Sequence, residues 1–436
     1  MKLVAAKDAE ELLYYVAYWT ALSGLVFIPS AAILVSTTRQ SFLRIAWLPC
    51  WGFLAYHLCH GICSTWRSLP LRGVLGGNII LIMLDVLGLL VMRRVEDKDL
   101  LNAGVYKKVD NFVSRVIKTS IFFCNLRAIG TAWQVKIVPA CPQFLAENRH
   151  ADGKLDRSWW VFRTTLIAGW QYLFLNLLEV QSLSQTPEEL YLVTGDDLEW
   201  PRLSFTAEQW AIRAATALSA ALGPTRVGID LWYRLLSMLC VVSGLSRPEA
   251  WPPLFGTILS TSTIRGSWAG MTHRLVRFPL STISDFIMRD LLGCSTKSLA
   301  GRCMTVILIF LISGLFHAAI ELLDNDGTDF HEKWQIVIFW GLSAAGIIFE
   351  EAVQMIWRGV AGSGPTRLWQ KVLGYVWVGI FFAVTYPLFL YPAMRQGPER
   401  MEMVPFDVVT GLGMPVAAGV AVGGGSLLML AIGGEV

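Results

Sequence analysis

The stretch Thr305-Val-Ile-Leu-Ile-Phe-Leu-Ile-Ser-Gly-Leu-Phe-His-Ala-Ala-Ile320 contains no charged residue and lies within a longer apolar run, residues 303–323. The hydrocarbon core of a bilayer is about 30 Å thick, and about 20 helical residues cross it. Every backbone polar group in such a segment must be satisfied without water, which an α-helix achieves within the segment itself. Residues 303–323 are therefore predicted to form a transmembrane helix, and the chain is predicted to have an all-α fold.

The composition extends this prediction to the whole chain. Of the 436 residues, 54% are apolar and 16% are charged, whereas about 25% are charged in soluble proteins. The mean hydropathy is +0.51, and 18 Trp outnumber 11 Tyr, which fits indole rings lying at membrane interfaces. These values exclude a soluble, disordered, collagen-like or coiled-coil protein and predict a polytopic α-helical membrane protein.

Apolar runs of membrane-spanning length recur along the chain and predict about nine spans, within a range of about eight to ten. They are residues 12–36, 42–63, 73–92, 159–182, 226–245, 303–323, 334–357, 372–392 and 407–432. Residues 205–222 carry Glu208 and Arg213, so an interfacial or re-entrant helix is expected there rather than a tenth span. Because no segment between spans is long enough to fold alone, residues 1–436 are predicted to form one integral-membrane domain.

The distribution of charge predicts the side of the membrane on which each loop lies, because loops retained in the cytosol are enriched in Lys and Arg. Residues 93–158 and 246–302 are basic, whereas residues 183–204 and 324–332 are acidic. We expect the basic segments in the cytosol, and the acidic segments and the N-terminus in the lumen of the endoplasmic reticulum. A tenth span would move residues 246–302 into the lumen, so the charge pattern disfavours it.

Several binding functions are disfavoured by charge and by cysteine and histidine spacing. The net charge of +3 is too small to indicate a nucleic acid partner. The eight cysteines lie mostly in apolar stretches and lack the paired spacing of a disulfide framework, so most are expected to be buried free thiols. In His57-Leu-Cys-His60-Gly-Ile-Cys63, the histidine and cysteine pairs project from different faces of a helix, so no metal site is expected.

His317 lies deep in the span 303–323. An ionisable side chain inside the membrane is a functional candidate, and a neutral imidazole can accept a proton. Ser313 and Gly314, one turn earlier, leave room on the same face for a substrate or a second helix. The alternative is that His317 only bonds to a neighbouring helix. The carboxylates within or near the membrane are expected to be packing or interfacial groups: Asp85, Glu179, Glu350 and Glu351.

Residues 246–302 lack a full-length apolar run and are rich in cations, so we expect a cytosolic or re-entrant segment that binds a ligand. The segment includes His273. Guanidinium groups match phosphate oxygens in pairs, so its arginines are candidates for binding phosphates: Arg265, Arg274 and Arg277. The alternative is that these arginines only contribute to the cytosolic excess of positive charge.

Three blocks of sequence stand in a specific order: Arg127-Ala-Ile-Gly-Thr-Ala-Trp-Gln-Val-Lys-Ile-Val-Pro139, then Trp251-Pro-Pro-Leu-Phe-Gly256 leading to Thr261-Ser-Thr-Ile-Arg-Gly-Ser-Trp-Ala-Gly-Met-Thr-His273, and finally Ser313-Gly-Leu-Phe-His317. With the layout of spans, they resemble the wax-synthase-like branch of membrane-bound O-acyltransferases over roughly residues 10 to 400. The likeness is greatest to fungal members that acetylate secondary metabolites such as terpenoids. It implies a transmembrane helix bundle of that family's type.

The resemblance implies acetyl transfer from acetyl-CoA, a co-substrate rather than a bound cofactor, to a hydroxyl of an apolar terpenoid or meroterpenoid. His317 corresponds to the catalytic base of the family and His273 to its polar partner. Trp268 and Ser313 are expected beside the substrate. Three residues depart from the family's usual Phe, Gly and Trp in the second block: Ser267, Ala269 and Thr272.

Two other functions stay open at this point. One is the synthesis of wax or sterol esters from long-chain acyl-CoA. The other is a proton-coupled transporter, whose intramembrane histidine and carboxylates relay protons, although the chain lacks obvious broken helices in matching halves. Glu321, one turn after His317, either orients His317 or faces the lumenal interface. The expected partners are acyl-CoA, a small alcohol and membrane lipid, and the oligomeric state is not implied.

Overall fold

The computed structural model describes residues 9–65, 69–136, 138–183, 200–202, 204–256, 261–271, 274–323, 330–362, 364, 366–395 and 402–432. These residues form helices joined by loops, and the β-type pairing found among them is one bridge between Arg149 and Leu155. The all-α class predicted from the sequence is therefore confirmed.

The helices follow one another in this order: α1 Ala9–Ser36, α2 Phe42–Thr65, α3 Leu69–Leu87 continued by a π-helical turn Gly88–Met92, α4 Asp97–Ala103, α5 Phe112–Phe123, α6 Gln143–Glu147, α7 Arg157–Leu183, α9 Ala207–Ala220, a π-helical segment Ala221–Gly228, α10 Ile229–Val242, a 3-10 turn Pro248–Ala250, α11 Ile264–Met271, a 3-10 turn Arg274–Val276, α12 Arg277–Asp285 continued by π-helical Phe286–Leu291, α13 Leu299–Leu322, α14 Phe330–Ala361, α15 Leu368–Arg395, α16 Val409–Leu412 and α17 Met414–Ile432.

Five helices of the described chain are long and apolar enough to cross a membrane, which fits an integral membrane protein. They cover Leu13–Ser36, Leu71–Met92, Leu299–Leu322, Trp334–Ala361 and Leu368–Pro392. The predicted spans 42–63 and 159–182 are also helical, as α2 and α7. These helices are less apolar because polar side chains recur in them, such as His57 and His60 in α2 and Gln171 and Asn176 in α7. The count of about nine spans is therefore not confirmed.

The expectation of a separate helix at 205–222, followed by a span at 226–245, is wrong. Helical residues run without interruption from Ala207 to Val242, because the π-helical segment 221–228 accommodates Pro224. Arg213 is buried, and it donates to the carbonyl oxygens of Ala383 (3.2 Å) and Val384 (3.0 Å) in α15. Pro387 has no N–H for the Ala383 carbonyl, so Arg213 supplies the missing donor and joins α9 to α15.

The last predicted span, 407–432, is also divided in the structure. The short helix α16 ends at Gly413, whose φ of +82° lies in the left-handed region that favours glycine. Only α17 continues as an apolar helix, and Trp170 of α7 donates to the carbonyl of Ala421 at 2.7 Å. Residues 407–432 are therefore two helices, of which the second packs against α7.

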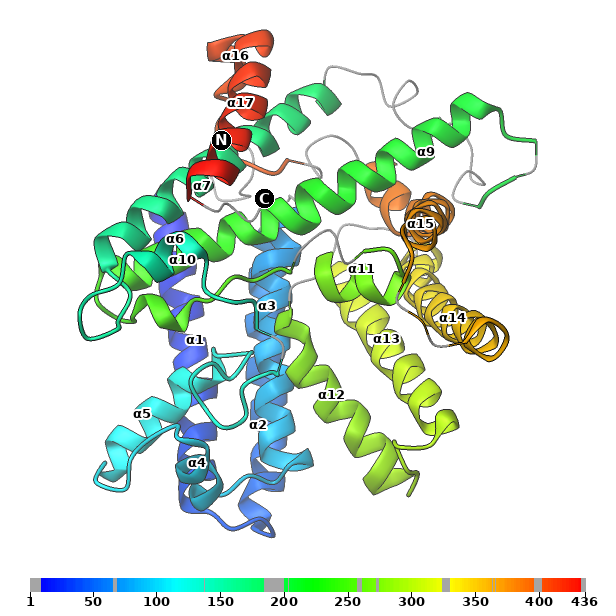
Figure 1. The fold of residues 1–436 in the computed structure, drawn as a ribbon. Coiled ribbons are helices and arrows are strands. Elements are labelled where there is room, and N and C mark those ends of the chain that lie inside the picture. Colours follow the sequence, from blue (N-terminus) through cyan, green and yellow to red (C-terminus); the bar gives the residue numbers. More distant parts are fainter. Residues whose placement is uncertain are drawn as a thin grey trace.

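Figure 1 shows how these helices position the region around α13. Helices α1, α2 and α3 lie side by side, with α4 and α5 at one end, while α7 and the continuous α9–α10 helix run obliquely across the other end. α13 packs against α3 and α12 on one side and against α14 on the other. A side chain on α13 is therefore surrounded by helices from both halves of the chain.

Candidate active site

His317 is held by its own helix and by the ring of Trp340 on α14. The Nδ1 atom of His317 lies 2.7 Å from the carbonyl oxygen of Ser313, and the imidazole stacks on Trp340 with ring centroids 4.5 Å apart. Because a carbonyl oxygen only accepts a hydrogen bond, Nδ1 carries the proton and Nε2 keeps its lone pair. Nε2 has no hydrogen-bond partner among the residues that the structure describes, so it is the atom able to accept a proton.

Aromatic rings surround His317 and connect it to α11. Trp340 packs against Trp268 with centroids 4.6 Å apart, so Trp268 lies one ring away from His317. Phe316 and Phe389 contact the imidazole edge-on, at 4.8 Å and 6.0 Å. Further rings close the group around Trp268 and Phe389: Phe310, Phe339, Phe382 and Tyr386. The predicted residues His317 and Trp268 thus share an apolar environment.

The close approach of α13 and α14 depends on Gly314. A Cβ atom at this position would lie 3.1 Å from both the Cβ of Trp340 and the Cα of Val337. The glycine therefore allows the backbones to approach until Trp340 covers His317. Ser313, its neighbour, is buried and contributes its carbonyl oxygen to the histidine.

The short helix α11, which carries Trp268 and Arg265, is fixed by α14 and α15. Glu350 of α14 accepts hydrogen bonds from the backbone N–H of Ile264 (2.6 Å) and from the indole of Trp377 (2.9 Å). Gly374 of α15 touches the backbone just before α11, because a Cβ there would lie 2.2 Å from the carbonyl oxygen of Ser262. Glu350 is therefore a structural group that orients the segment predicted to bind the donor.

The predicted partner of His317 and the predicted phosphate ligands are only partly described. His273 lies outside the described residues, and the side chain of Arg274 does as well. Arg265 is half exposed and forms an ion pair with Glu351 at 2.6 Å. Arg277 is exposed at the start of α12 and has no ion pair within the described chain. No described contact brings Arg265 and Arg277 together.

The end of α13 that carries His317 is also bound to α2 and α3. Arg72 of α3 is fully buried, and its Nη1 lies 3.8 Å from Oε2 of Glu321. Nδ1 of His60 lies 2.7 Å from the carbonyl oxygen of Leu323. Glu321 is 8% exposed, so it is buried against Arg72. These contacts set the position of the helix turn that follows His317.

Arg127 is a structural residue to which the sequence assigns no role. Its Nη1 donates to the carbonyl oxygen of Pro253 (2.8 Å), and its Nη2 donates to that of Pro252 (2.8 Å) and to the Tyr233 hydroxyl (2.5 Å). Arg127 begins the first of the three sequence blocks named above, and Pro252 lies in the second, so the arginine holds the two blocks together. In the sequence, Arg127 could be noticed only because it begins a block. Its acceptors include backbone carbonyls, which every residue has, so the sequence does not reveal them.

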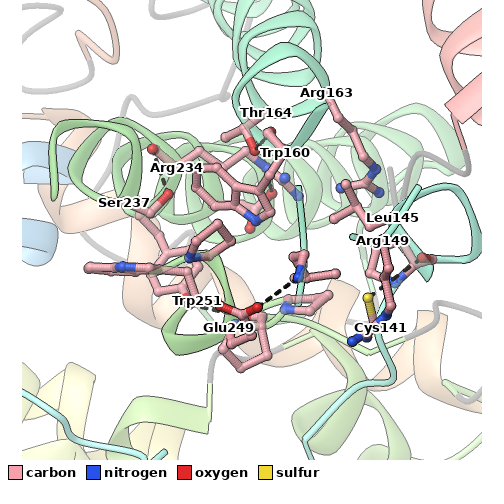
Figure 2. A pocket seen from close by; sticks show the side chains of 17 residues that line it. Cys141, Leu145, Arg149, Trp160, Arg163, Thr164, Arg234, Ser237, Glu249 and Trp251 are labelled. Atoms are coloured by element: carbon pink, nitrogen blue, oxygen red, sulfur yellow. Dashed lines mark hydrogen bonds and ion pairs between the residues drawn. The ribbon is translucent and has the colours of Figure 1, made fainter. Parts of the chain in front are cut away.

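A cavity of about 180 Å³ lies between α7, α10 and the loops that precede α7 and follow α10. Figure 2 shows Arg163 reaching from α7 toward Arg149, with Arg234 and Ser237 of α10 on the other side. The cavity is separate from the rings around His317, and the sequence did not predict it. Its lining residues are Cys141, Pro142, Leu145, Arg149, Leu155, Trp160, Arg163, Thr164, Asp230, Tyr233, Arg234, Ser237, Pro248, Glu249, Trp251, Pro252 and Pro253.

Comparisons with known proteins connect this geometry to one family. Residues 251–341, which include α11, α12, α13 and His317, match the family described as "membrane bound O-acyl transferase". The chain is similar to acetyltransferase pyr8 of Aspergillus fumigatus, 33% identical over 98% of this chain and 97% of that protein. It is also similar to acetyltransferase TRI7 of Fusarium sporotrichioides, 31% identical over 96% of this chain and 91% of that protein. No solved structure matches.

Proposed function

The chain belongs to the membrane-bound O-acyltransferase family and is an acyltransferase, and from this premise we propose that it transfers acetyl from acetyl-CoA to a hydroxyl of an apolar secondary metabolite. The observation that carries the proposal is the Nδ1 contact of His317 with the Ser313 carbonyl, which leaves Nε2 as a proton acceptor. Relatives named as acetyltransferases support acetyl as the transferred group. A terpenoid or meroterpenoid acceptor and the endoplasmic reticulum membrane belong to the same proposal.

In the proposed reaction, Nε2 of His317 removes the proton of the acceptor hydroxyl as its oxygen attacks the thioester carbonyl carbon. The carbon–sulfur bond of the tetrahedral intermediate then breaks, the ester is released, and the CoA thiolate takes up the proton from His317. His273 is proposed to donate a hydrogen bond to the carbonyl oxygen, on which negative charge develops. No covalent enzyme intermediate is required.

The surroundings of His317 suit an apolar acceptor. Trp268, Trp340 and the neighbouring rings supply apolar surface and exclude water, which limits hydrolysis of the thioester. The donor is proposed to approach from the cytosolic segment 246–302, where Arg265, Arg274 and Arg277 are candidates for binding its phosphates. At Arg265, a phosphate would have to replace the carboxylate of Glu351.

The first test is the substitution His317→Ala in full-length purified protein. Loss of a general base lowers the rate by about 10² to 10⁴-fold, so acetyl transfer to an apolar alcohol should fall by that amount while the protein stays folded. His57→Ala, which removes a half-buried histidine from α2, is the matched control and should keep normal turnover. A folded His317→Ala variant with wild-type turnover would show that the base is another group.

Donor length provides a second test. The imidazole is bounded by the rings of Trp340 at 4.5 Å and Phe316 at 4.8 Å, so a short acyl group should fit beside it better than a long one. A fitted pocket discriminates by about tenfold or more per methylene. Acetyl-CoA should therefore be consumed at least about tenfold faster than palmitoyl-CoA. Equal rates would favour a wax or sterol ester synthase, and consumption that is independent of an alcohol would contradict acyl transfer.

A further inference from the structure

We propose that the cavity between α7 and α10 (Figure 2) binds a phosphate group carried by an amphiphilic ligand. No residue of this α7–α10 cavity belongs to the rings around His317, and none takes part in the proposed transfer. The proposal therefore concerns a second binding site, and it holds or fails independently of the role of His317.

Three arginines line the cavity, and two of them are buried. Arg163 lines the cavity while only 3% exposed, Arg234 is 8% exposed, and Arg149 lies at the exposed rim. A guanidinium group offers a planar set of N–H donors that matches phosphate oxygens in pairs. Two of these groups lie in surroundings of low dielectric constant, where attraction to an anion is stronger than in water.

The two carboxylates that line the cavity, Asp230 and Glu249, accept hydrogen bonds from residues around it. Oδ2 of Asp230 accepts hydrogen bonds from Nε of Arg234 (2.6 Å) and from Nε2 of Gln171 (2.7 Å). Oε1 of Glu249 accepts from the backbone N–H of Leu155 at 2.8 Å. The buried guanidinium of Arg127 adds a further cation behind the wall formed by Pro252. Among the described residues that line the cavity, three arginines outnumber the two carboxylates, which favours an anion.

The remaining walls suit a ligand that is partly apolar. Trp160, Tyr233 and Trp251 line the cavity, and the rings of Tyr233 and Trp251 pack edge-to-face with centroids 5.2 Å apart. An inorganic ion would leave these aromatic surfaces unused. A phosphate attached to an aromatic base or to an acyl-bearing headgroup would contact both the arginines and the rings.

The position of the cavity indicates two sources for such a ligand. Its loops, residues 141–155 and 248–253, belong to the segments predicted to be cytosolic, where CoA is dissolved. On the outer surface of α7 and α10, large apolar side chains are exposed as expected for contact with lipid: Trp159, Phe162, Leu166, Leu235, Leu236, Leu239 and Val242. Basic pockets between membrane helices on the cytosolic side bind anionic lipid headgroups. The nucleotide part of CoA and a phospholipid headgroup share the phosphate chemistry.

Cys141 allows occupancy of the cavity to be measured without acetyl transfer, because it lines the cavity and is half-buried. The full-length protein is reconstituted in phosphatidylcholine nanodiscs, and alkylation of Cys141 by a maleimide is followed by peptide mass spectrometry. Adenosine 3′,5′-bisphosphate is added in one arm, and phosphatidylinositol 4-phosphate is included in the disc in the other. A ligand at ten times its Kd should slow labelling about tenfold. The exposed Cys294, outside the cavity, should react at an unchanged rate.

Protection by the bisphosphate would identify a soluble nucleotide phosphate as the ligand of this second site, and protection by the phosphoinositide alone would identify a membrane lipid. Arg163→Gln and Arg149→Gln should each reduce the protection, whereas Arg358→Gln, which removes an exposed arginine of α14, should not. Because Arg149 is exposed, Arg149→Gln is expected to fold, and it decides the test if Arg163→Gln does not fold. Absence of protection in both arms, or protection that survives in every folded variant of the two arginines, would overturn the proposal.

Discussion

The imidazole of His317 is oriented by the backbone carbonyl of Ser313, and the Ser313 hydroxyl is not part of that contact. Ser313→Ala should therefore leave the base in place. A neutral hydrogen bond contributes about 0.5–1.5 kcal/mol, so turnover should stay within about a factor of ten of the wild type. Steady-state rates with acetyl-CoA measure this directly. A loss as large as that of His317→Ala would mean that the hydroxyl itself contacts the reacting groups.

The contact between Arg72 and Glu321 predicts a second effect at the scale of single residues. Removing one partner of a buried ion pair costs about 3–5 kcal/mol, because the other charge is left buried. Arg72→Met should therefore lower the midpoint of thermal unfolding in detergent, and the double variant with Glu321→Met should recover part of the loss. If the pair positions α13, the folded Glu321→Gln variant should have a reduced kcat and a nearly normal KM for acetyl-CoA.

The exposed pair Arg39–Asp99 is the control for this experiment. Arg39 is 52% exposed in its side chain, and surface ion pairs contribute less than about 1 kcal/mol. Arg39→Met should therefore leave the unfolding midpoint nearly unchanged. An equal loss in Arg39→Met and Arg72→Met would show that the buried pair has no special role in holding α13.

At the scale of elements, the packing of α11 against α14 and α15 gives a specific prediction. A Cβ at Gly374 would lie 2.2 Å from the Ser262 carbonyl oxygen, whereas no atom of the described residues lies within 4 Å of the corresponding position at Gly379 on the same helix. Alanine favours a helix over glycine by up to about 1 kcal/mol. Gly379→Ala should thus be neutral or stabilising, but Gly374→Ala should displace the start of α11 and lower the transfer rate. If both variants behave alike in unfolding and activity assays, Gly374 is not required for the packing of α11 against α15.

Helix positions were largely predictable from apolar runs, but continuity between helices was not. The runs 303–323, 334–357 and 372–392 correspond to α13, α14 and α15. Gly223 and Pro224 indicate a break in the sequence, yet the π-helical segment 221–228 absorbs the proline and joins α9 to α10. That outcome depends on tertiary contacts, such as those of Arg213 with carbonyls of α15, which local sequence does not contain.

In the candidate site, too, some residues could be proposed from the sequence and others could not. His317 and Trp268 were predictable because a polar group within an apolar span and a tryptophan in a recognisable block are visible in the sequence. The role of Arg127 was not predictable, because its acceptors include the backbone carbonyls of Pro252 and Pro253, more than a hundred residues away. The α7–α10 cavity was missed for a related reason, since its arginines are scattered across two helices and a loop.

At the scale of the whole molecule, the arrangement across the membrane can be tested at Ser204 and Ser298, which are both exposed. Among the described residues between these two serines, the continuous helix of α9 and α10 is the one long enough to cross a bilayer core of about 30 Å. Helix α11 has 8 residues, or about 12 Å at 1.5 Å per residue, and cannot cross. One crossing places the two serines on opposite sides, with Ser298 in the cytosol, as the basic loop 246–302 predicts.

The measurement uses Ser204→Cys and Ser298→Cys, each introduced into a variant whose eight native cysteines are replaced by alanine. In sealed microsomes, a membrane-impermeant maleimide added outside should label Cys at position 298 and reach position 204 only after the membrane is opened with detergent. Normal acetyl transfer by the cysteine-free protein is the control for its fold. Labelling of both positions from the outside would show that α9 and α10 do not cross the membrane. The basic segment and the α7–α10 cavity would then need a new assignment of sides.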